Sequence, residues 1–291
     1  MKTATNLIEI SWEVCNLVGG IHTVLASKAE QMVEQYGERY LVIGPYLPNS
    51  NLEFQEEIWN ADLLGTLTQQ GLECRMGRWT VPGSPRCVLV KFEKLHQSKD
   101  KILANYWEQY HLNSLYGGWD YIEPVLFGHA AGMIADVYFK QVVKPAGHRA
   151  IMQCHEWMTA AALLHLRQTS PEIGTVFTTH ATVLARAMYG NNRKIDVTTH
   201  DAVKLDLLAH ELGVSSKHSM EVVAAREADC FTTVSALTAD ECALLLGRRP
   251  DILLLNGIGA KFPDPDFAKP EAAANSKDKL FKLAQLCTGF T

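Results

Sequence analysis

The stretch LIEISWEVCNLVGGIHTVLASKA, residues 7–29, decides the fold, because an apolar strand runs through a short loop into Gly19-Gly20 and on into a helix. Glycine leaves no side chain between peptide N–H groups and a ligand, and a helix that starts there offers unpaired donors and the positive end of its dipole. The stretch therefore predicts a strand–loop–helix junction that can hold a nucleotide phosphate. Ordinary turn chemistry also explains paired glycines, and neither the dinucleotide-binding spacing nor the P-loop Lys-Ser/Thr pair is present.

Short apolar runs alternate with longer segments of helical period along the rest of the chain. Strands are expected at 7–11, 40–44, 86–92, 149–153, 174–179, 229–234 and 251–255. Helices are expected at 20–35, 98–111, 123–142, 158–168, 199–212, 216–227 and 236–246. Continuous apolar strands separated by helices are typical of a parallel sheet covered on both faces. The pattern predicts an α/β fold with a doubly wound, Rossmann-like parallel sheet, in which ligands bind beyond the carboxyl ends of the strands.

Composition narrows the class of protein. The 291 residues are 47% hydrophobic and 20% charged, which is typical of a chain with a full apolar core. The net charge of -5 and the lack of basic segments interleaved with aromatic residues argue against a nucleic-acid partner. Seven scattered cysteines predict reduced thiols in a cytoplasmic protein. No apolar run reaches membrane-spanning length, so we expect neither export nor a membrane partner.

Polar residues follow four of the expected strands. Residues 13–20 follow the first strand, His155 and His180 follow two later strands, and Asn256-Gly257 follows the last. An isolated buried histidine commonly holds a loop by hydrogen bonds, but two histidines at neighbouring strand ends favour a shared pocket. No histidine, cysteine or carboxylate falls at a repeated ligand spacing, so we expect no metal.

A set of ordered segments, covering roughly residues 7–262, carries a resemblance to a known family. The segments are SWEVCN (11–16) with VGGI (18–21), IGPY (43–46), MGRW (76–79), VLFG (125–128), HEWM (155–158), FTTHAT (177–182), FTTVS (231–235) and NG (256–257). On these segments the chain resembles the N-terminal domain of glycogen synthases of the animal, fungal and bacterial type, glycosyltransferase family 3.

The resemblance implies a GT-B arrangement, in which two Rossmann-like domains face each other across a cleft. It implies retaining transfer of glucose from a nucleotide-glucose, UDP- or ADP-glucose, to the non-reducing end of an α-1,4-glucan, with no resident cofactor. Residues 1–262 are expected to form the N-terminal domain. Residues 263–291 are expected to form a linker and helix leading toward a C-terminal donor-binding domain that this chain lacks, so the expected partners include a separate synthase domain or a homo-oligomer.

The resemblance also assigns roles to six residues of this sequence. It implies catalytic roles for His155, which matches a histidine contacting the donor glucose, and for His180, which lines the cleft. Gly19 and Gly20 match positions beside the diphosphate and the transferred sugar. Arg186 matches a cleft residue that binds the donor, and Asn256 ends a strand near the interdomain hinge.

Three departures from the family pattern leave a second hypothesis open. Leu17 stands where the family usually has Lys or Arg, a cation suited to the donor phosphates. Alanines at 160–162 and 185 replace expected glycines, and Leu254-Leu255 replaces a Thr-Pro pair. A noncatalytic relative that binds glucan or a partner synthase fits these departures. An unrelated Rossmann-type nucleotide-binding enzyme is the reading that remains if the ordered matches are accidental.

Two further groups have both a structural and a functional interpretation. Glu13 and Glu156 are candidate acids, but we expect them to cap backbone groups or to pair with Arg186. The aromatic residues between Tyr106 and Trp119 could stack on sugar rings, but helix packing is the expected role.

Overall fold

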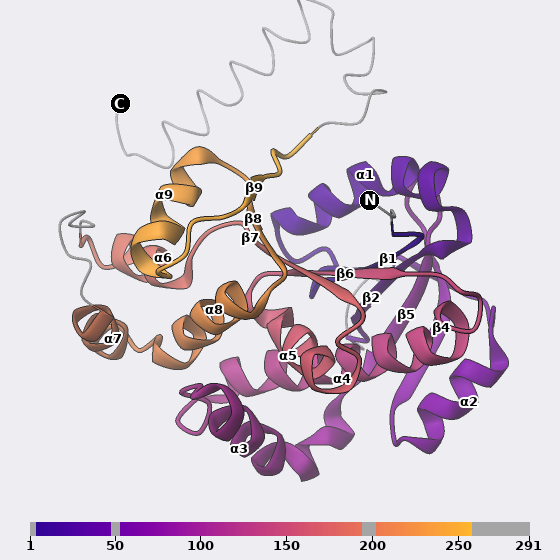
Figure 1. Cartoon of the computed structure of the whole chain (residues 1–291), viewed down its shortest axis with the longest axis horizontal. Helices are drawn as coiled ribbons and strands as arrows, with labels where there is room; N and C mark the ends of the chain where they lie inside the picture. Colours follow the sequence, from indigo (N-terminus) through magenta and orange to yellow (C-terminus); the bar gives the residue numbers. More distant parts are fainter. Residues whose placement is uncertain (1–3, 48–52, 194–201, 258–291) are drawn as a thin grey trace, which may run out of the picture. The chain divides into compact units, whose positions relative to one another are not determined.

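The computed structural model describes residues 4–47, 53–193 and 202–257, and this part of the chain contains one nine-stranded sheet of order β3-β4-β5-β2-β1-β6-β7-β8-β9 (Figure 1). Seven strands pair in parallel: β1 (Asn6–Ile10), β2 (Tyr40–Pro45), β5 (Arg86–Lys91), β6 (Ala150–His155), β7 (Gly174–Thr179), β8 (Cys230–Thr233) and β9 (Ile252–Leu253). Strands β3 (Phe54–Glu56) and β4 (Glu73–Trp79) pair antiparallel at one edge.

Helices connect the strands. They are α1 (Gly20–Tyr36), α2 (Ala61–Gln69), α3 (Lys99–Tyr110), α4 (Trp119–Tyr138), α5 (Ala160–Thr169), α6 (Val183–Gly190), α7 (Ala202–Glu211), α8 (Ser215–Glu227) and α9 (Ala236–Leu245). Short 3-10 turns cover Gly37–Arg39, Glu93–Ser98 and Trp157–Thr159, and a π-helical turn, Phe139–Val143, extends α4. None of the helices in the described ranges is both long and apolar enough to cross a bilayer.

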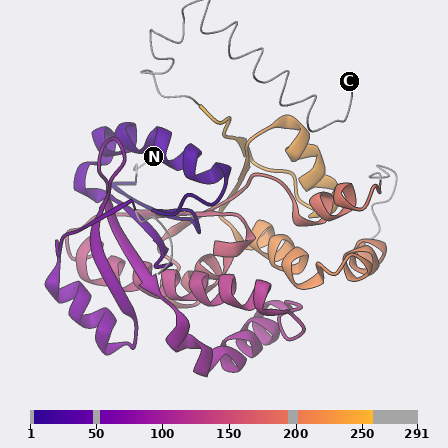
Figure 2. The same ribbon diagram turned by 180° about the vertical axis from the view of Figure 1, so that it is seen from behind.

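Alternation along β1 shows how the sheet is covered on both faces. Ile8 and Ile10 belong to a large core that includes side chains of α4 and α5. Leu7, on the opposite face, packs against a second core that includes Leu25 of α1. Figures 1 and 2 show α1 on one side of the sheet and α2, α4 and α5 on the other. The structure therefore confirms a doubly wound α/β fold.

Whether a strand was predicted from the sequence depends on how deeply that strand is buried. All seven parallel strands were predicted, because each is a nearly continuous apolar run. The antiparallel strands β3 and β4 were not predicted, since Glu73–Trp79 alternates polar and apolar residues and is only partly buried. Helices α2 and α6 were also missed. The helix expected from residue 199 begins at Ala202 in the described residues, and the linker and helix expected at 263–291 lie outside them.

The order of the strands defines where a ligand can bind. From β1 the chain moves through β2 to β5 on one side, and β6 to β9 then fill the other side. The direction of winding changes between β1 and β6, which are paired from Asn6–Ala150 to Ile10–Cys154. In doubly wound sheets the crevice at such a switch point, beyond the carboxyl ends of the strands, is the usual ligand site.

Small residues bring α4 and α5 into close contact. Alanines 160–162, which replace expected glycines, are fully buried. The facing helix accommodates their methyl groups with glycines: a Cβ placed on Gly128 would lie 3.1 Å from Cβ of Ala161. A Cβ on Gly132 would lie 2.9 Å from Cβ of His165 and 3.0 Å from Cα of Ala162. The alanines are therefore compatible with tight packing of the two helices.

We expect Gly132→Ala to destabilise the protein by about 1–3 kcal/mol, because its methyl group overpacks the contact between α4 and α5. Gly65→Ala is the matched control in the exposed middle of α2, where an added Cβ meets nothing within 4 Å. It should stabilise the protein by about 0.5–1 kcal/mol through helix propensity. Urea unfolding measures both changes, and a Gly132→Ala protein as stable as the parent would contradict the packing argument.

Candidate functional site

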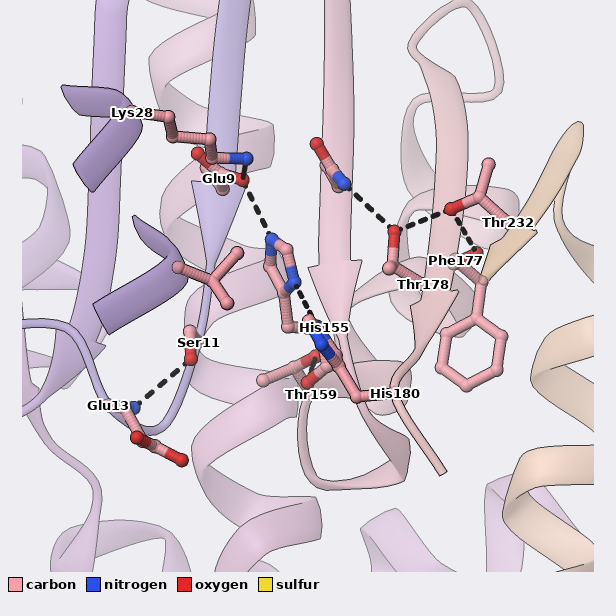
Figure 3. A network of polar contacts seen from close by, with 12 residues as sticks. Glu9, Ser11, Glu13, Lys28, His155, Thr159, Phe177, Thr178, His180 and Thr232 are labelled. Atoms are coloured by element: carbon pink, nitrogen blue, oxygen red, sulfur yellow. Dashed lines mark hydrogen bonds and ion pairs between the residues drawn. The ribbon is translucent and has the colours of Figure 1, made fainter. Parts of the chain in front are cut away.

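A chain of side chains links three neighbouring strands at the switch point (Figure 3). Nε2 of His155, at the end of β6, lies 2.7 Å from Oε1 of Glu9 on β1. Nδ1 of the same ring lies 3.1 Å from Nε2 of His180, which directly follows β7. The two histidines that were predicted to share a pocket are therefore in direct contact at the carboxyl edge of the sheet.

Glu9 is a fully buried carboxylate surrounded by donors. The hydroxyl of Tyr40 on β2 donates to Oε2 at 2.5 Å, and the ammonium of Lys28 on α1 pairs with Oε1. Burial alone would raise the pKa of Glu9, but Lys28 and His155 outweigh it and hold the pKa far below its ordinary value. Glu9 is therefore ionised, with both of its oxygens engaged.

Both histidines are held neutral. Burial lowers the pKa of His155 even though Glu9 acts in the opposite direction. Burial, with contributions from His155, Lys28 and Arg186, lowers the pKa of His180 to about 3. His155 is 2% exposed and both of its ring nitrogens are used within the protein, whereas His180 is half-buried. His180 is thus the outer member of the pair.

The glycine pair lies at the start of α1, as predicted, and a side chain already binds there. Oε2 of Glu13 accepts hydrogen bonds from N–H of Gly19 at 2.9 Å and from N–H of His22 at 2.8 Å. A Cβ on Gly19 would lie 2.8 Å from Oε1 of Glu13, so glycine makes room for this carboxylate. At Gly20 an added Cβ would meet nothing within 4 Å. The expected capping role of Glu13 is confirmed, and Gly20 is the open position.

Glu156 holds the loop that carries His180. Its Oε1 accepts from the backbone N–H of His180 at 2.8 Å and lies 3.8 Å from Nη2 of Arg186, as the structural interpretation of this residue predicted. Burial raises its pKa. Its backbone has φ 64° and ψ 165°, a region occupied almost only by glycine, which costs about 1–3 kcal/mol for other residues.

Glu221 of α8 is a second buried acid behind the same loop. Its Oε2 accepts from N–H of Val183 at 2.8 Å, at the start of α6, while its buried Oε1 makes no hydrogen bond within the described residues. Burial, followed by the nearby charge of Glu156, raises the pKa of Glu221 well above its ordinary value. The surroundings of Glu221 therefore favour the protonated form of its carboxyl group.

The remaining predicted residues lie along the same edge of the sheet. Arg186 is in the first turn of α6 with its side chain 61% exposed. Leu17, in the loop before the glycine pair, is 72% exposed. Asn256 follows β9, which is separated from β6 by β7 and β8. The roles assigned to these residues and to His155, His180, Gly19 and Gly20 stay predictions.

The sequence pattern did not predict Glu9, Lys28, Tyr40 or Glu221 as part of the site. One signal was available for Glu9, because a single carboxylate in the apolar strand LIEIS is costly to bury without a partner. No such signal identifies its partners, since they depend on which strands and helices lie beside β1.

The aromatic residues between Tyr106 and Trp119 lie in two different environments, one buried and one exposed. Tyr106 is buried, and its hydroxyl contacts Nδ1 of His129 at 2.7 Å, which agrees with the expected helix packing. Tyr116 is 87% exposed and lines a cavity of about 490 Å³ that also includes Asp120 and Lys217. Within the described ranges, no cluster of three or more His, Cys, Asp or Glu residues is arranged to hold a metal ion.

Comparison with protein families identifies the class of this α/β protein. A family model described as glycogen synthase matches residues 9–273, which is most of the chain. The chain therefore belongs to the glycogen synthase family. The resemblance predicted from the ordered sequence segments is confirmed.

Individual relatives agree with this assignment. The chain is 32% identical to the human liver glycogen [starch] synthase over 262 residues, which is 88% of this chain and 36% of that protein. It is 31% identical to isoform 1 of glycogen [starch] synthase from Saccharomyces cerevisiae, over 87% of this chain and 37% of the relative. The chain thus spans a little more than a third of the length of these relatives.

A structural comparison finds the catalytic domain of Starch Synthase IV from Arabidopsis thaliana, bound to ADP and acarbose. The sequence identity is 17% and the TM-score is 0.48, over 90% of this chain and 54% of that chain.

Glu221→Gln tests whether the second acid is buried in its protonated form. A group whose pKa is raised on folding contributes stability that is fully present below its ordinary pKa, here 4.5, and is lost as the pH rises through the folded value. Glutamine cannot ionise, so its stability does not fall in this way. Between pH 4.5 and the folded pKa, we expect the free energy of unfolding of the variant to rise relative to that of the parent by about 1.4 kcal/mol per pH unit. Denaturant unfolding at several pH values measures the difference.

The control for this prediction is Glu108→Gln, at an exposed position of α3. Its stability should follow the parent at every pH. A Glu221→Gln protein whose stability also parallels the parent across the range would show that the acid is not protonated in the folded state.

Proposed function

We propose that this chain forms the N-terminal half of a glycogen-synthase-type glucosyltransferase. In this proposal glucose passes, with retention of configuration, from UDP- or ADP-glucose to the non-reducing end of an α-1,4-glucan. Membership of the glycogen synthase family carries the proposal. The placement of the glycine pair, His180 and Arg186 supports it, because they lie at the edge where doubly wound sheets bind ligands.

The chemistry of this transfer fits groups present at the edge of the sheet. A leaving diphosphate needs positive charge or N–H donors, and the sugar needs fixed polar groups around its oxocarbenium-like transition state. The exposed guanidinium of Arg186 and the open start of α1 at Gly20 supply the first kind of group. The neutral, fixed ring of His180 supplies the second.

Partners and location follow from the same proposal. The relatives extend well beyond the length matched here, so the second half of the cleft comes from a C-terminal synthase domain, either on the same polypeptide or on another. The proposed partners also include a second copy of this chain, as in a homo-oligomer. The donor is a substrate, no resident cofactor takes part, and the reaction takes place in the cytoplasm.

A noncatalytic, glucan- or partner-binding relative is the second candidate, and Leu17 is the observation that favours it. Its side chain is 72% exposed beside the glycine loop, at the position where the family usually has a cation. A leucine here cannot neutralise a donor phosphate. Losing one charge-assisted contact of this kind removes about 2–4 kcal/mol of transition-state stabilisation.

Transfer of radiolabelled glucose to glycogen tests both candidates. The chain is assayed alone and joined to the C-terminal half of a relative, with UDP-glucose and with ADP-glucose. We expect transfer by the joined protein and at least a tenfold rise on Leu17→Lys, equivalent to about 1.4 kcal/mol of transition-state stabilisation.

Ile58→Lys is the matched control, because it places the same charge at an exposed apolar residue beside the edge strand β3. It should leave the rate unchanged. No transfer in any format, together with no binding of glycogen, would overturn the enzymatic proposal. Transfer that does not respond to Leu17→Lys would show that the missing cation is not the limitation.

A further inference from the structure

The hydrogen bonds at the switch point have a direction, and Glu9 sets it. Lys28 and Tyr40 both donate to this buried carboxylate, which is ionised and can only accept. The bond between Glu9 and His155 is 2.7 Å long, so Nε2 of His155 must carry the proton.

The direction of the next bond follows from the count of protons on a neutral imidazole. A neutral ring has one N–H and one acceptor nitrogen. His155 uses its only N–H on Glu9, so its Nδ1 must accept from Nε2–H of His180 at 3.1 Å. His180 has then used its own N–H, which leaves Nδ1 as an acceptor. In the described part of the chain this nitrogen makes no further hydrogen bond.

We propose that Glu9 is a positioning residue that fixes the tautomers of His155 and His180, so that Nδ1 of His180 faces the ligand site as a hydrogen-bond acceptor. The ligand group that suits a neutral acceptor nitrogen is a hydroxyl, as in a sugar, rather than the diphosphate of a nucleotide-sugar, which is fully ionised at neutral pH and has no proton to donate. This inference rests on the proposed function, because it names which part of a nucleotide-sugar or glucan meets His180.

Charges from every neighbouring element bear on this assignment. Lys28 on α1 and Arg186 on α6 disfavour protonation of His180, and Glu9 on β1 acts in the opposite direction. Glu13 in the loop after β1 favours protonation of His155. Burial decides the outcome, since it lowers the pKa of both rings. One added proton on either ring would turn the outer Nδ1 into a donor, so neutrality of the pair is essential.

Nitrogen-15 NMR of the histidine rings tests the assignment directly on the intact chain at pH 7. We expect His155 and His180 each to carry a single proton on Nε2, with an unprotonated Nδ1. The resonances are assigned by comparison with His155→Gln and His180→Gln. A proton on Nδ1 of His180 would overturn the proposal. The result does not depend on glucosyl transfer, so this inference and the proposed function can fail separately.

Glu9→Gln tests the part played by the carboxylate. The glutamine amide can both donate and accept, so we expect His155 and His180 to become mixtures of tautomers. Glu73→Gln is the matched control, since Glu73 is also a strand glutamate paired with a lysine, Lys91, but at the exposed edge. It should leave both rings unchanged. Unchanged tautomers in Glu9→Gln would contradict a positioning role.

If circular dichroism shows that Glu9→Gln does not fold, Lys28→Met is measured in its place. Without the ammonium, the charge of Glu9 is uncompensated and should draw a proton onto the histidine pair. The pH at which Nδ1 of His180 becomes protonated should then rise. An unchanged pH would show that Glu9 does not control the pair.

Titration with two probes tests the class of ligand. D-glucose represents the hydroxyl class and inorganic sulfate, which has no proton to donate at pH 7, represents the anion class. We expect glucose to shift the Nδ1 resonance of His180 and sulfate to leave it unchanged at pH 7. A shift with sulfate alone, or with neither probe, would contradict recognition of a hydroxyl at this nitrogen.

Discussion

The charge of Glu9, buried at the centre of the sheet, is the constraint on which the arrangement of the ligand edge depends. A carboxylate in an apolar interior is tolerated only when its oxygens are paired and hydrogen-bonded. Here the partners come from α1, β2 and β6, so a single buried ion ties together the elements on both sides of the switch point. Any movement of β6 away from β1 would leave that charge without its histidine.

The loops beyond the strands are held by the same means. Glu13 binds the backbone at the start of α1, and Glu156 binds the backbone of His180. Three groups at this edge can meet a ligand: the open Gly20, the outer nitrogen of His180, and the guanidinium of Arg186, which is 61% exposed although it lies 3.8 Å from Glu156. The edge of the sheet is thus held by hydrogen bonds at its base and accessible at its surface, which is the arrangement that preorganised binding requires.

Much of this architecture could be predicted from the sequence, for physical reasons. Strands buried on both faces have a continuous apolar pattern, so all seven parallel strands were found, and their ends brought His155 and His180 together as expected. The strand Glu73–Trp79 has no such pattern because it is only partly buried, and it was missed. The partners of Glu9 were also missed, since His155 lies 146 positions away and meets it only through the register of β1 and β6.

The backbone of Glu156 has a consequence for how this chain can change over generations. Glycine at position 156 would relieve the strain of the positive φ angle. Relief of this strain alone would therefore favour replacement of Glu156 by glycine. That replacement would also remove the carboxylate that holds the His180 loop. Retention of an acidic residue at this position across lineages would therefore show that fixing the His180 loop outweighs the backbone strain that the residue requires.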